Sequence, residues 1–134
     1  MGAGGERDLK ALLRSMQPAL MPETYAYVTI PAGGAIPANL NPLSTFKEPE
    51  GWSLLLTERE AIASKLTHAF WCRGISLQIQ PSLFAVGLLA AISDRLARAG
   101  ISINIISAYH RDYIFVPTIR AEETLSILRK MASG

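Results

Sequence analysis

The chain has 134 residues, 49% of them hydrophobic and 18% charged, and 13 Lys and Arg against 11 Asp and Glu leave a formal net charge of +2. This length suits one ordinary domain or two very small ones, and the composition excludes a long multidomain enzyme and a disordered chain. The basic residues are scattered without a run, so we expect no nucleic-acid partner.

Cysteine usage and the hydrophobic windows indicate a soluble, cytoplasmic protein. The single cysteine, Cys72, cannot form an intrachain disulfide, and the N-terminal segment lacks the apolar stretch of a signal peptide. Two uncharged windows, residues 24–46 and 74–93, approach the length of a membrane-spanning helix. Prolines and glycines interrupt the first, and the second alternates apolar with polar residues before Pro81, so we expect neither to cross a membrane.

The first predicted elements are a helix, a strand and a long irregular segment. Apolar residues at helical spacing predict an amphipathic helix over residues 8–16, whose apolar stripe must pack against another element. The alternation of residues 24–30 predicts a strand, with the even-numbered side chains on one face. Residues 31–42 hold three prolines and two glycines, a pattern typical of a lid or binding loop.

Further strands and a capped helix follow. Residues 52–56 are predicted to form a short buried strand. Thr57 and Glu60 match a capping box, in which hydroxyl and carboxylate satisfy free amides reciprocally, and so begin a helix. Residues 68–73 form a second β-like run, which Gly74 separates as a joint from the strand that follows.

The second half predicts the order strand, helix, strand, strand, helix. The predicted elements are a strand over 75–80, a helix over about 84–99 capped by Gly100, strands over 101–108 and 113–116 joined by a turn at His110-Arg111-Asp112, and a last helix capped by Thr118. This order is most of a βαββαβ ferredoxin-like unit, and the first half has the strands and one helix of a second, looser copy.

Motifs of common enzymes and metal sites do not occur in this sequence. There is no HExxH, CxxC, GxGxxG, GxxxxGK[ST] or GxSxG, so we expect no metal, no cofactor and no catalytic site.

Three groups of side chains have both a functional and a structural interpretation. His110 and Asp112 share a turn and could form a general-base pair, although polar residues at a hairpin tip usually face water. Cys72 would be a reactive thiol if exposed, but its apolar neighbours favour a buried structural role. Glu48 lies in a polar stretch that could pair with a cationic ligand or simply be solvated.

The start of the strongest predicted helix is a candidate anion site. Residues 81–87 lead from a strand into a helix start rich in small residues, where free backbone amides and the helix dipole favour a carboxylate. Asn104 points away from the face of the neighbouring isoleucines and could bond a polar ligand. The structural alternative is that Ser82 is only a helix cap and Asn104 only a polar edge residue.

Residues 74–117 resemble an ACT domain, the regulatory module of aspartate kinases and other enzymes of amino-acid metabolism. The resemblance lies in the helix entry Ala85-Val86-Gly87 and in the segment Ala99-Gly100-Ile101-Ser102-Ile103-Asn104-Ile105. Upstream, Phe46-Lys47-Glu48-Pro49-Glu50-Gly51 is similar to the Phe-x-Glu-x-Glu-Gly segment of a family of small stand-alone tandem ACT proteins, long catalogued as a domain of unknown function. Length and order agree over nearly the whole chain.

The resemblance implies an α+β fold of two ferredoxin-like ACT modules, a divergent one over residues 1–70 and an ACT domain over residues 71–134. It also implies that the helix-entry amides hold the carboxylate of an amino-acid ligand, with Asn104 on its ammonium or side chain and Asp112 or Glu48 as the counter-charge. The implied ligand-binding residues are Pro81, Ser82, Leu83, Phe84, Ala85, Val86, Gly87, Asn104, Glu48 and Asp112.

We therefore expect a non-catalytic regulatory protein or sensor that binds a small molecule, an amino acid. Because strand edges left exposed would benefit from a partner, we also expect a homo-oligomer such as a homodimer. One alternative is a ligand-independent protein-interaction or assembly subunit, and another is a small enzyme that uses His110 and Asp112.

Overall fold

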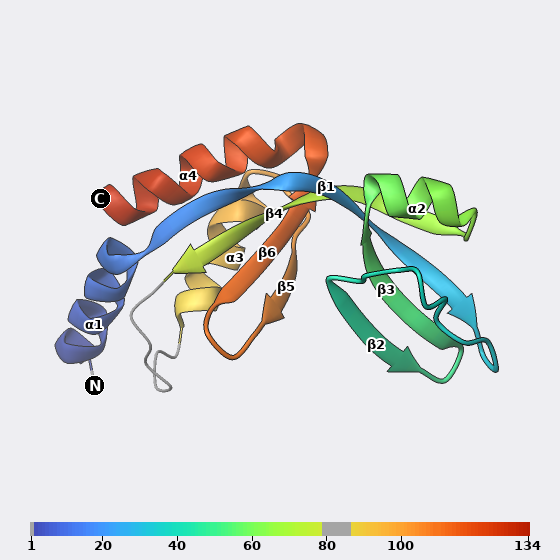
Figure 1. The fold of residues 1–134 in the computed structure, drawn as a ribbon. Coiled ribbons are helices and arrows are strands. Elements are labelled where there is room, and N and C mark those ends of the chain that lie inside the picture. The colour runs from blue at the N-terminus through green and yellow to red at the C-terminus, as the bar shows by residue number, and fades with distance from the viewer. Residues whose placement is uncertain (1, 79–86) are drawn as a thin grey trace. The chain divides into compact units, whose positions relative to one another are not determined.

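The computed structural model describes residues 2–78 and 87–134. Its elements are α1 (Gly2–Ser15), β1 (Gln17–Pro31), β2 (Ser44–Glu48), β3 (Gly51–Thr57), α2 (Glu58–Ser64), β4 (His68–Gln78), α3 (Leu88–Arg98), β5 (Asn104–Ser107), β6 (Asp112–Pro117), the 3-10 turn η1 (Thr118–Arg120) and α4 (Ala121–Ser133). The strands form one sheet in the order β2-β3-β1-β4-β6-β5 (Figure 1). The predicted α+β class and the two ferredoxin-like modules are confirmed.

The chain divides into two compact units. Unit 1 contains residues 1–21 and 74–134, and unit 2 contains residues 22–73. Because β1 and β4 run through both boundaries, each unit holds a part of both strands, and in each unit these parts complete a four-stranded order typical of a ferredoxin-like module. The predicted modules 1–70 and 71–134 follow the sequence without interruption, whereas the compact units interleave, since residues 1–21 pack with the C-terminal part.

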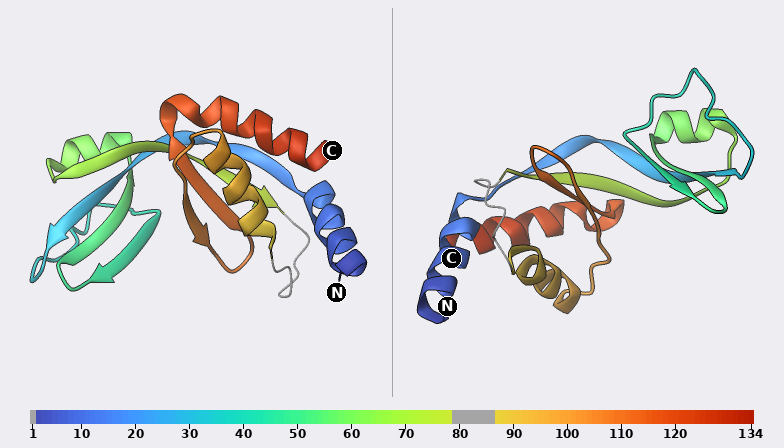
Figure 2. Two further views of the ribbon diagram at one scale, coloured as in Figure 1. Left: turned by 180° about the vertical axis from the view of Figure 1, so that it is seen from behind. Right: turned by 90° about the horizontal axis from the view of Figure 1, so that it is seen from below.

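Unit 1 is built around a core between its strands and the helices α3 and α4. Its fully buried side chains include Ile75 and Leu77 from β4, Ile114 from β6, Ile92 from α3 and Leu128 from α4. Both helices cover the same face of these strands (Figure 2). The apolar stripe predicted for residues 8–16 is confirmed, because the leucines of α1 pack against this core and α1 contacts α4.

Unit 2 has a smaller core on one face of its strands. The even-numbered residues of β1 face this core, as the alternation predicts, with Leu54 and Leu56 from β3 and Ala61 from α2. The crossover from β1 to β2, which carries a helix in a βαββαβ unit, is the irregular segment of residues 32–43, which we call the strap. The strap places Ile36 and Leu40 against the core.

The capping box is half confirmed. Thr57 is the N-cap of α2, in extended backbone conformation, and its Oγ1 accepts a hydrogen bond from the Glu60 amide at 3.3 Å. The Glu60 carboxylate accepts one from the Asn41 amide of the strap at 2.7 Å. The carboxylate thus ties the strap to α2, a long-range contact that the capping pattern does not predict.

Several predicted boundaries are wrong, each for a local reason. Gly74 is not a joint but lies inside the unbroken strand β4, where a Cβ would come within 2.6 Å of Met21 Sδ and 2.7 Å of Phe115 Cε1. A strand, β2, forms where the sequence suggested a polar linker before β3, and it pairs with β3 from Ser44 to Glu48.

The helix boundaries also move. The predicted helix start at residues 84–86 lies outside the described residues, and Gly87 is not helical, because its left-handed φ of 97° makes it the N-cap of α3. Thr118 does not cap α4, since the chain leaves β6 through η1 and places Arg120 at that position. The hydroxyl of Thr118 is instead buried without a hydrogen-bond partner.

Candidate functional site

The predicted ligand site centres on the segment of residues 81–87 that leads into α3. The structure describes only the last residue of this segment, Gly87. Pro81, Ser82, Leu83, Phe84, Ala85 and Val86 lie outside the described residues. Gly87 has no side-chain capping bond, and the first turn of α3 contains no acidic residue. A Cβ added at Gly87 would meet nothing within 4 Å. Within the described residues, therefore, no cap side chain accepts a hydrogen bond from the first amides of α3, an arrangement in which the helix dipole favours an anion.

Asn104 begins β5 and is exposed. It pairs with Phe115, whereas the next residue, Ile105, pairs with Ile114, a core residue beneath α3 and α4. Because successive strand residues point to opposite faces, Asn104 lies on the face away from α3. The predicted parity of Asn104 against the neighbouring isoleucines is confirmed.

Asp112 lies at the other end of the hairpin, paired with Ser107. By the same alternation it shares the helix-covered face with Ile114, so Asn104 and Asp112 point to opposite faces, about 10 Å apart along the strands. One small ligand on a single unit 1 cannot contact both side chains. Glu48 is an exposed residue of β2 in unit 2, where it pairs with Gly51.

His110 and Asp112, the residues considered for an enzyme, are not joined by a hydrogen bond in the described part of the chain. His110 is exposed in the hairpin, where its ring packs edge-on against Tyr109 with centroids 4.9 Å apart. Within the described residues, no group of three or more His, Cys, Asp or Glu side chains could hold a metal ion. A shallow groove of ≈ 450 Å³ runs along α4 past Leu125 and Arg129, and none of the predicted site residues lines its described part.

Cys72 is fully buried in β4, as its apolar neighbours indicated. Burial raises the pKa of its thiol to about 11, because a thiolate would lose its hydration there. The thiol donates to the Tyr25 carbonyl at 3.6 Å. Cys72 is therefore protonated and inert at neutral pH, which favours the structural interpretation.

A glycine-based cap ends α3. The helix closes with a Schellman motif, in which Gly100 adopts a left-handed φ of 73° and donates to Ala97, while Ile101 donates to Leu96. The predicted cap at Gly100 is confirmed. It also explains why β5 begins only at Asn104, since Ile101 still belongs to the closure of the helix.

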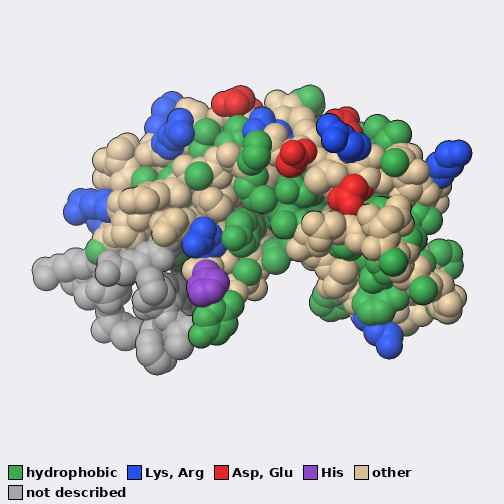
Figure 3. Space-filling view, viewed as in Figure 1, with side chains coloured by type: hydrophobic (Ala, Val, Ile, Leu, Met, Phe, Trp, Pro, Cys, Tyr) green, Lys and Arg blue, Asp and Glu red, His purple; other side chains and the backbone are tan. Residues whose placement is uncertain are grey.

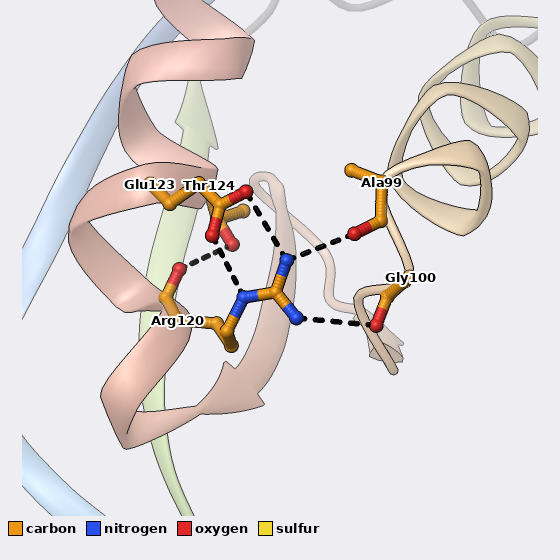
Figure 4. Close-up of polar contacts among 5 residues, drawn as sticks. All are labelled: Ala99, Gly100, Arg120, Glu123 and Thr124. Carbon is orange, nitrogen blue, oxygen red and sulfur yellow. Dashed lines mark hydrogen bonds and ion pairs between the residues drawn. The ribbon is translucent and has the colours of Figure 1, made fainter.

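Arg120 is a residue that the sequence pattern missed (Figure 4). Its guanidinium donates to the Ala99 carbonyl at 2.8 Å and the Gly100 carbonyl at 3.3 Å, and it binds both carboxylate oxygens of Glu123 at 2.7 and 3.1 Å. This ion pair lowers the pKa of Glu123 and raises that of Arg120, because each charge and its hydrogen bonds stabilise the other. We call these contacts the Arg120 clasp. The i,i+3 spacing of Arg120 and Glu123 in the sequence indicates an ion pair on a helix. Nothing in the sequence indicates that Arg120 also binds the carbonyls of Ala99 and Gly100.

On the face drawn in Figure 3, Lys and Arg side chains are scattered and form no continuous patch. In the described part of the chain, no helix combines the length and the apolar character needed to cross a bilayer.

The fold and the paired modules define a tandem ACT architecture, and comparison with known families agrees. Models of the ACT domain match residues 4–73 and residues 71–130. The chain therefore belongs to the ACT-domain family.

Solved structures extend this result. The chain is similar to a protein of unknown function from Vibrio cholerae, described as a possible transport protein, with 38% identity, a TM-score of 0.87, and coverage of 96% of this chain and 98% of that one. It shares its fold with a protein from Agrobacterium tumefaciens (19% identity, TM-score 0.71, 87% and 89% covered). It also shares it with the ligand-free regulatory subunit of aspartate kinase from Thermus thermophilus (14%, 0.61, 87% and 98%). No curated protein matches the chain in sequence.

Proposed function

We propose that this chain is a non-catalytic, cytoplasmic sensor that binds an amino acid and regulates a partner or its own assembly. The membership of both modules in the ACT family carries the proposal, and the regulatory subunits of aspartate kinase that share the fold support it. Fold similarity alone does not identify a ligand, so the proposal also depends on the chemistry around α3.

In this proposal the start of α3 binds the ligand carboxylate. Gly87 supports it, because this N-cap of a helix of 11 residues has no side chain to bind the first amides, and the first turn of α3 contains no acidic residue. Asn104 lies on the opposite face of the sheet, so a ligand that reaches both requires a second module. We therefore propose a homodimer in which Asn104 of one chain completes a pocket at α3 of the other.

Calorimetric titration of the amino acids into wild type and Asn104→Ala tests this site. Loss of a hydrogen bond to a charged ligand group should weaken binding by about tenfold or more. Ser107→Ala is the matched control, because Ser107 is an exposed residue of the same strand on the other face, and it should leave the affinity unchanged. Equal affinity in wild type and Asn104→Ala would remove Asn104 from the site.

An assembly subunit without a ligand is the second candidate. It is favoured by two exposed apolar side chains at the edge of unit 2, Phe46 on β2 and Leu43 just before it, which are 70% and 47% exposed. Exposed apolar residues at a strand edge commonly mark a protein interface. This candidate predicts a dimer whose dissociation constant, measured by analytical ultracentrifugation, rises in Phe46→Ser. The same constant should not change when any amino acid is added.

A further inference from the structure

The strap covers part of the unit 2 core that a helix would cover in a complete βαββαβ module. The helix α2, which has only seven residues, also packs on this core. Two partly buried side chains of the strap, Ile36 and Leu40, pack on the core, which itself is almost inaccessible to solvent. Two apolar contacts are a small hydrophobic anchor for a segment of this length.

Close packing fixes the strap over β1. A Cβ added at Gly34 would lie 2.8 Å from Cγ2 of Ile30 and 3.1 Å from the Pro31 carbonyl. The strap backbone therefore lies directly on the Ile30 side chain, with no room for a further methyl group. Ile30 is 4% exposed, and Gly34 of the strap is among the groups packed against it.

Hydrogen bonds hold the strap mainly at its two ends. Ala32 donates to the Glu50 carbonyl at 2.9 Å, and Leu43 donates to the Leu55 carbonyl at 2.8 Å. Gly34 and Leu40 donate only to carbonyls three residues earlier, as in local turns.

Between the ends, the hydrogen bond that ties the strap to the rest of the described unit 2 runs from the Asn41 amide to Glu60 Oε2, at 2.7 Å. The other carboxylate oxygen, Oε1, accepts from the Thr57 hydroxyl at 3.3 Å. A single charged side chain thus fastens the strap to the start of α2 at Asn41, two residues before its C-terminal anchor at Leu43.

We propose that the strap is a latched cover. It opens about its two ends while the sheet and α2 stay folded, and the Glu60 carboxylate is the latch. Segments with few buried apolar contacts and solvent-exposed hydrogen bonds open locally at a lower free energy than the whole domain unfolds. Opening exposes the apolar surface around Ile30, so unit 2 has a closed form and an open form that differ in accessible hydrophobic surface. This proposal does not depend on an amino-acid ligand.

Native-state proteolysis of the full chain with thermolysin tests the latch. Thermolysin cleaves before large apolar residues, so Ile36 and Leu40 are substrates once the strap is open. When opening and closing are fast, the cleavage rate follows the population of the open form. In Glu60→Ala we expect strap cleavage about five- to tenfold faster than in wild type, the effect of one charge-assisted hydrogen bond. Glu60→Gln keeps an acceptor oxygen and should lie between the two.

Two further variants separate the latch from general destabilisation. Glu58→Ala removes a carboxylate from the same first turn of α2 and should change strap cleavage less than about twofold, since a helix-dipole charge has a small effect. Gly34→Ala should also accelerate cleavage, because the new methyl group pushes the strap away from Ile30. Equal strap cleavage in Glu60→Ala and Glu58→Ala would overturn the proposal, as would a strap cleavage that follows global unfolding in urea.

Discussion

Gly51 follows the turn between β2 and β3 and supplies the glycine of the Phe-x-Glu-x-Glu-Gly segment. Its φ is 135°, and a Cβ there would overlap the carbonyl oxygen of Ile30. Pro31 is its partner across the β1–β3 pair, so the two backbones approach closely at this point. The glycine is thus required by strand pairing and by its positive φ, without any ligand.

We expect Gly51→Ala to destabilise the fold by about 2–4 kcal/mol, from backbone strain combined with the steric overlap. Gly87→Ala is the matched control, since Gly87 also has a positive φ but nothing near its Cβ position, and it should cost about 1 kcal/mol. Urea unfolding measures both. Equal losses in the two variants would show that the close approach to Ile30 does not matter.

The buried thiol of Cys72 should make the free energy of unfolding depend on pH. The folded thiol has its pKa raised from 9.0 to about 11, so between these values the native state holds a proton that the unfolded chain has lost. The contribution of Cys72 to stability is therefore complete below pH 9 and is lost as the pH rises toward 11.

Urea unfolding of wild type and Cys72→Ala between pH 8 and about pH 10.5 measures this contribution. The stability difference between the two proteins should shift against wild type as the pH rises. Burial also raises the pKa values of Tyr25 and Tyr27, and the charge of the Cys72 thiolate raises both further. Removing Cys72 removes this further cause, which changes the stability difference in the same direction as the loss of the thiol. Parallel pH profiles would contradict a thiol protonated by burial.

At the scale of elements, the Arg120 clasp joins the end of α3 to the start of α4. We expect Arg120→Ala to lower Tm, because the Ala99 and Gly100 carbonyls and the Glu123 carboxylate lose their shared donor. Arg120→Lys should restore little of it, since an ammonium cannot match the planar fork of a guanidinium.

The control for the clasp is the ion pair of Asp94 and Arg98 on α3, whose side chains are 62% and 75% exposed. Arg98→Ala should leave Tm nearly unchanged, because an isolated surface pair contributes little. Scanning calorimetry at low and high salt measures both effects. A Tm loss in Arg98→Ala as large as that in Arg120→Ala would contradict a structural role for the clasp.

Helices and strands whose apolar residues recur at a regular spacing were predictable from the sequence. Strand segments that form only because a neighbouring strand pairs with them were not. The alternation of β1 from Ala26 to Ile30 and the period of α3 follow from local burial. Pro18 and Pro22 hid the first part of β1, because proline usually interrupts a strand. They are tolerated here because β1 pairs with β3 only from Tyr25 onward, so neither proline has to donate a hydrogen bond to that strand.

Predicting the candidate site from sequence reached individual residues but not their arrangement. The parity of Asn104 follows from a local pattern. The sequence predicts the start of the helix near residue 84, whereas the N-cap of α3 is Gly87. That Asn104 and Asp112 point to opposite faces depends on the hairpin register, which one sequence does not fix residue by residue. The capping pattern indicates Glu60, but the contacts of Arg120 and Glu60 with backbone groups far away in sequence follow from no local motif.

At the scale of the whole molecule, the two modules share their long strands. The first strand and the fourth strand of unit 2 continue into unit 1, so unit 2 is one stretch of sequence (22–73) inserted between the two stretches that make up unit 1 (1–21 and 74–134). In the sensor that we propose, a ligand can act only if it binds two states of the protein with different affinity.

Thermal unfolding of the full chain with each amino acid at millimolar concentration tests the central claim most directly. A ligand at about 100 times its Kd adds about 2.7 kcal/mol to the native state, which raises Tm by several degrees. The sensor proposal predicts a selective rise with one amino acid or a few of related chemistry. An unchanged Tm with all of them would contradict it and leave the ligand-independent assembly subunit as the function that the exposed edge of unit 2 supports.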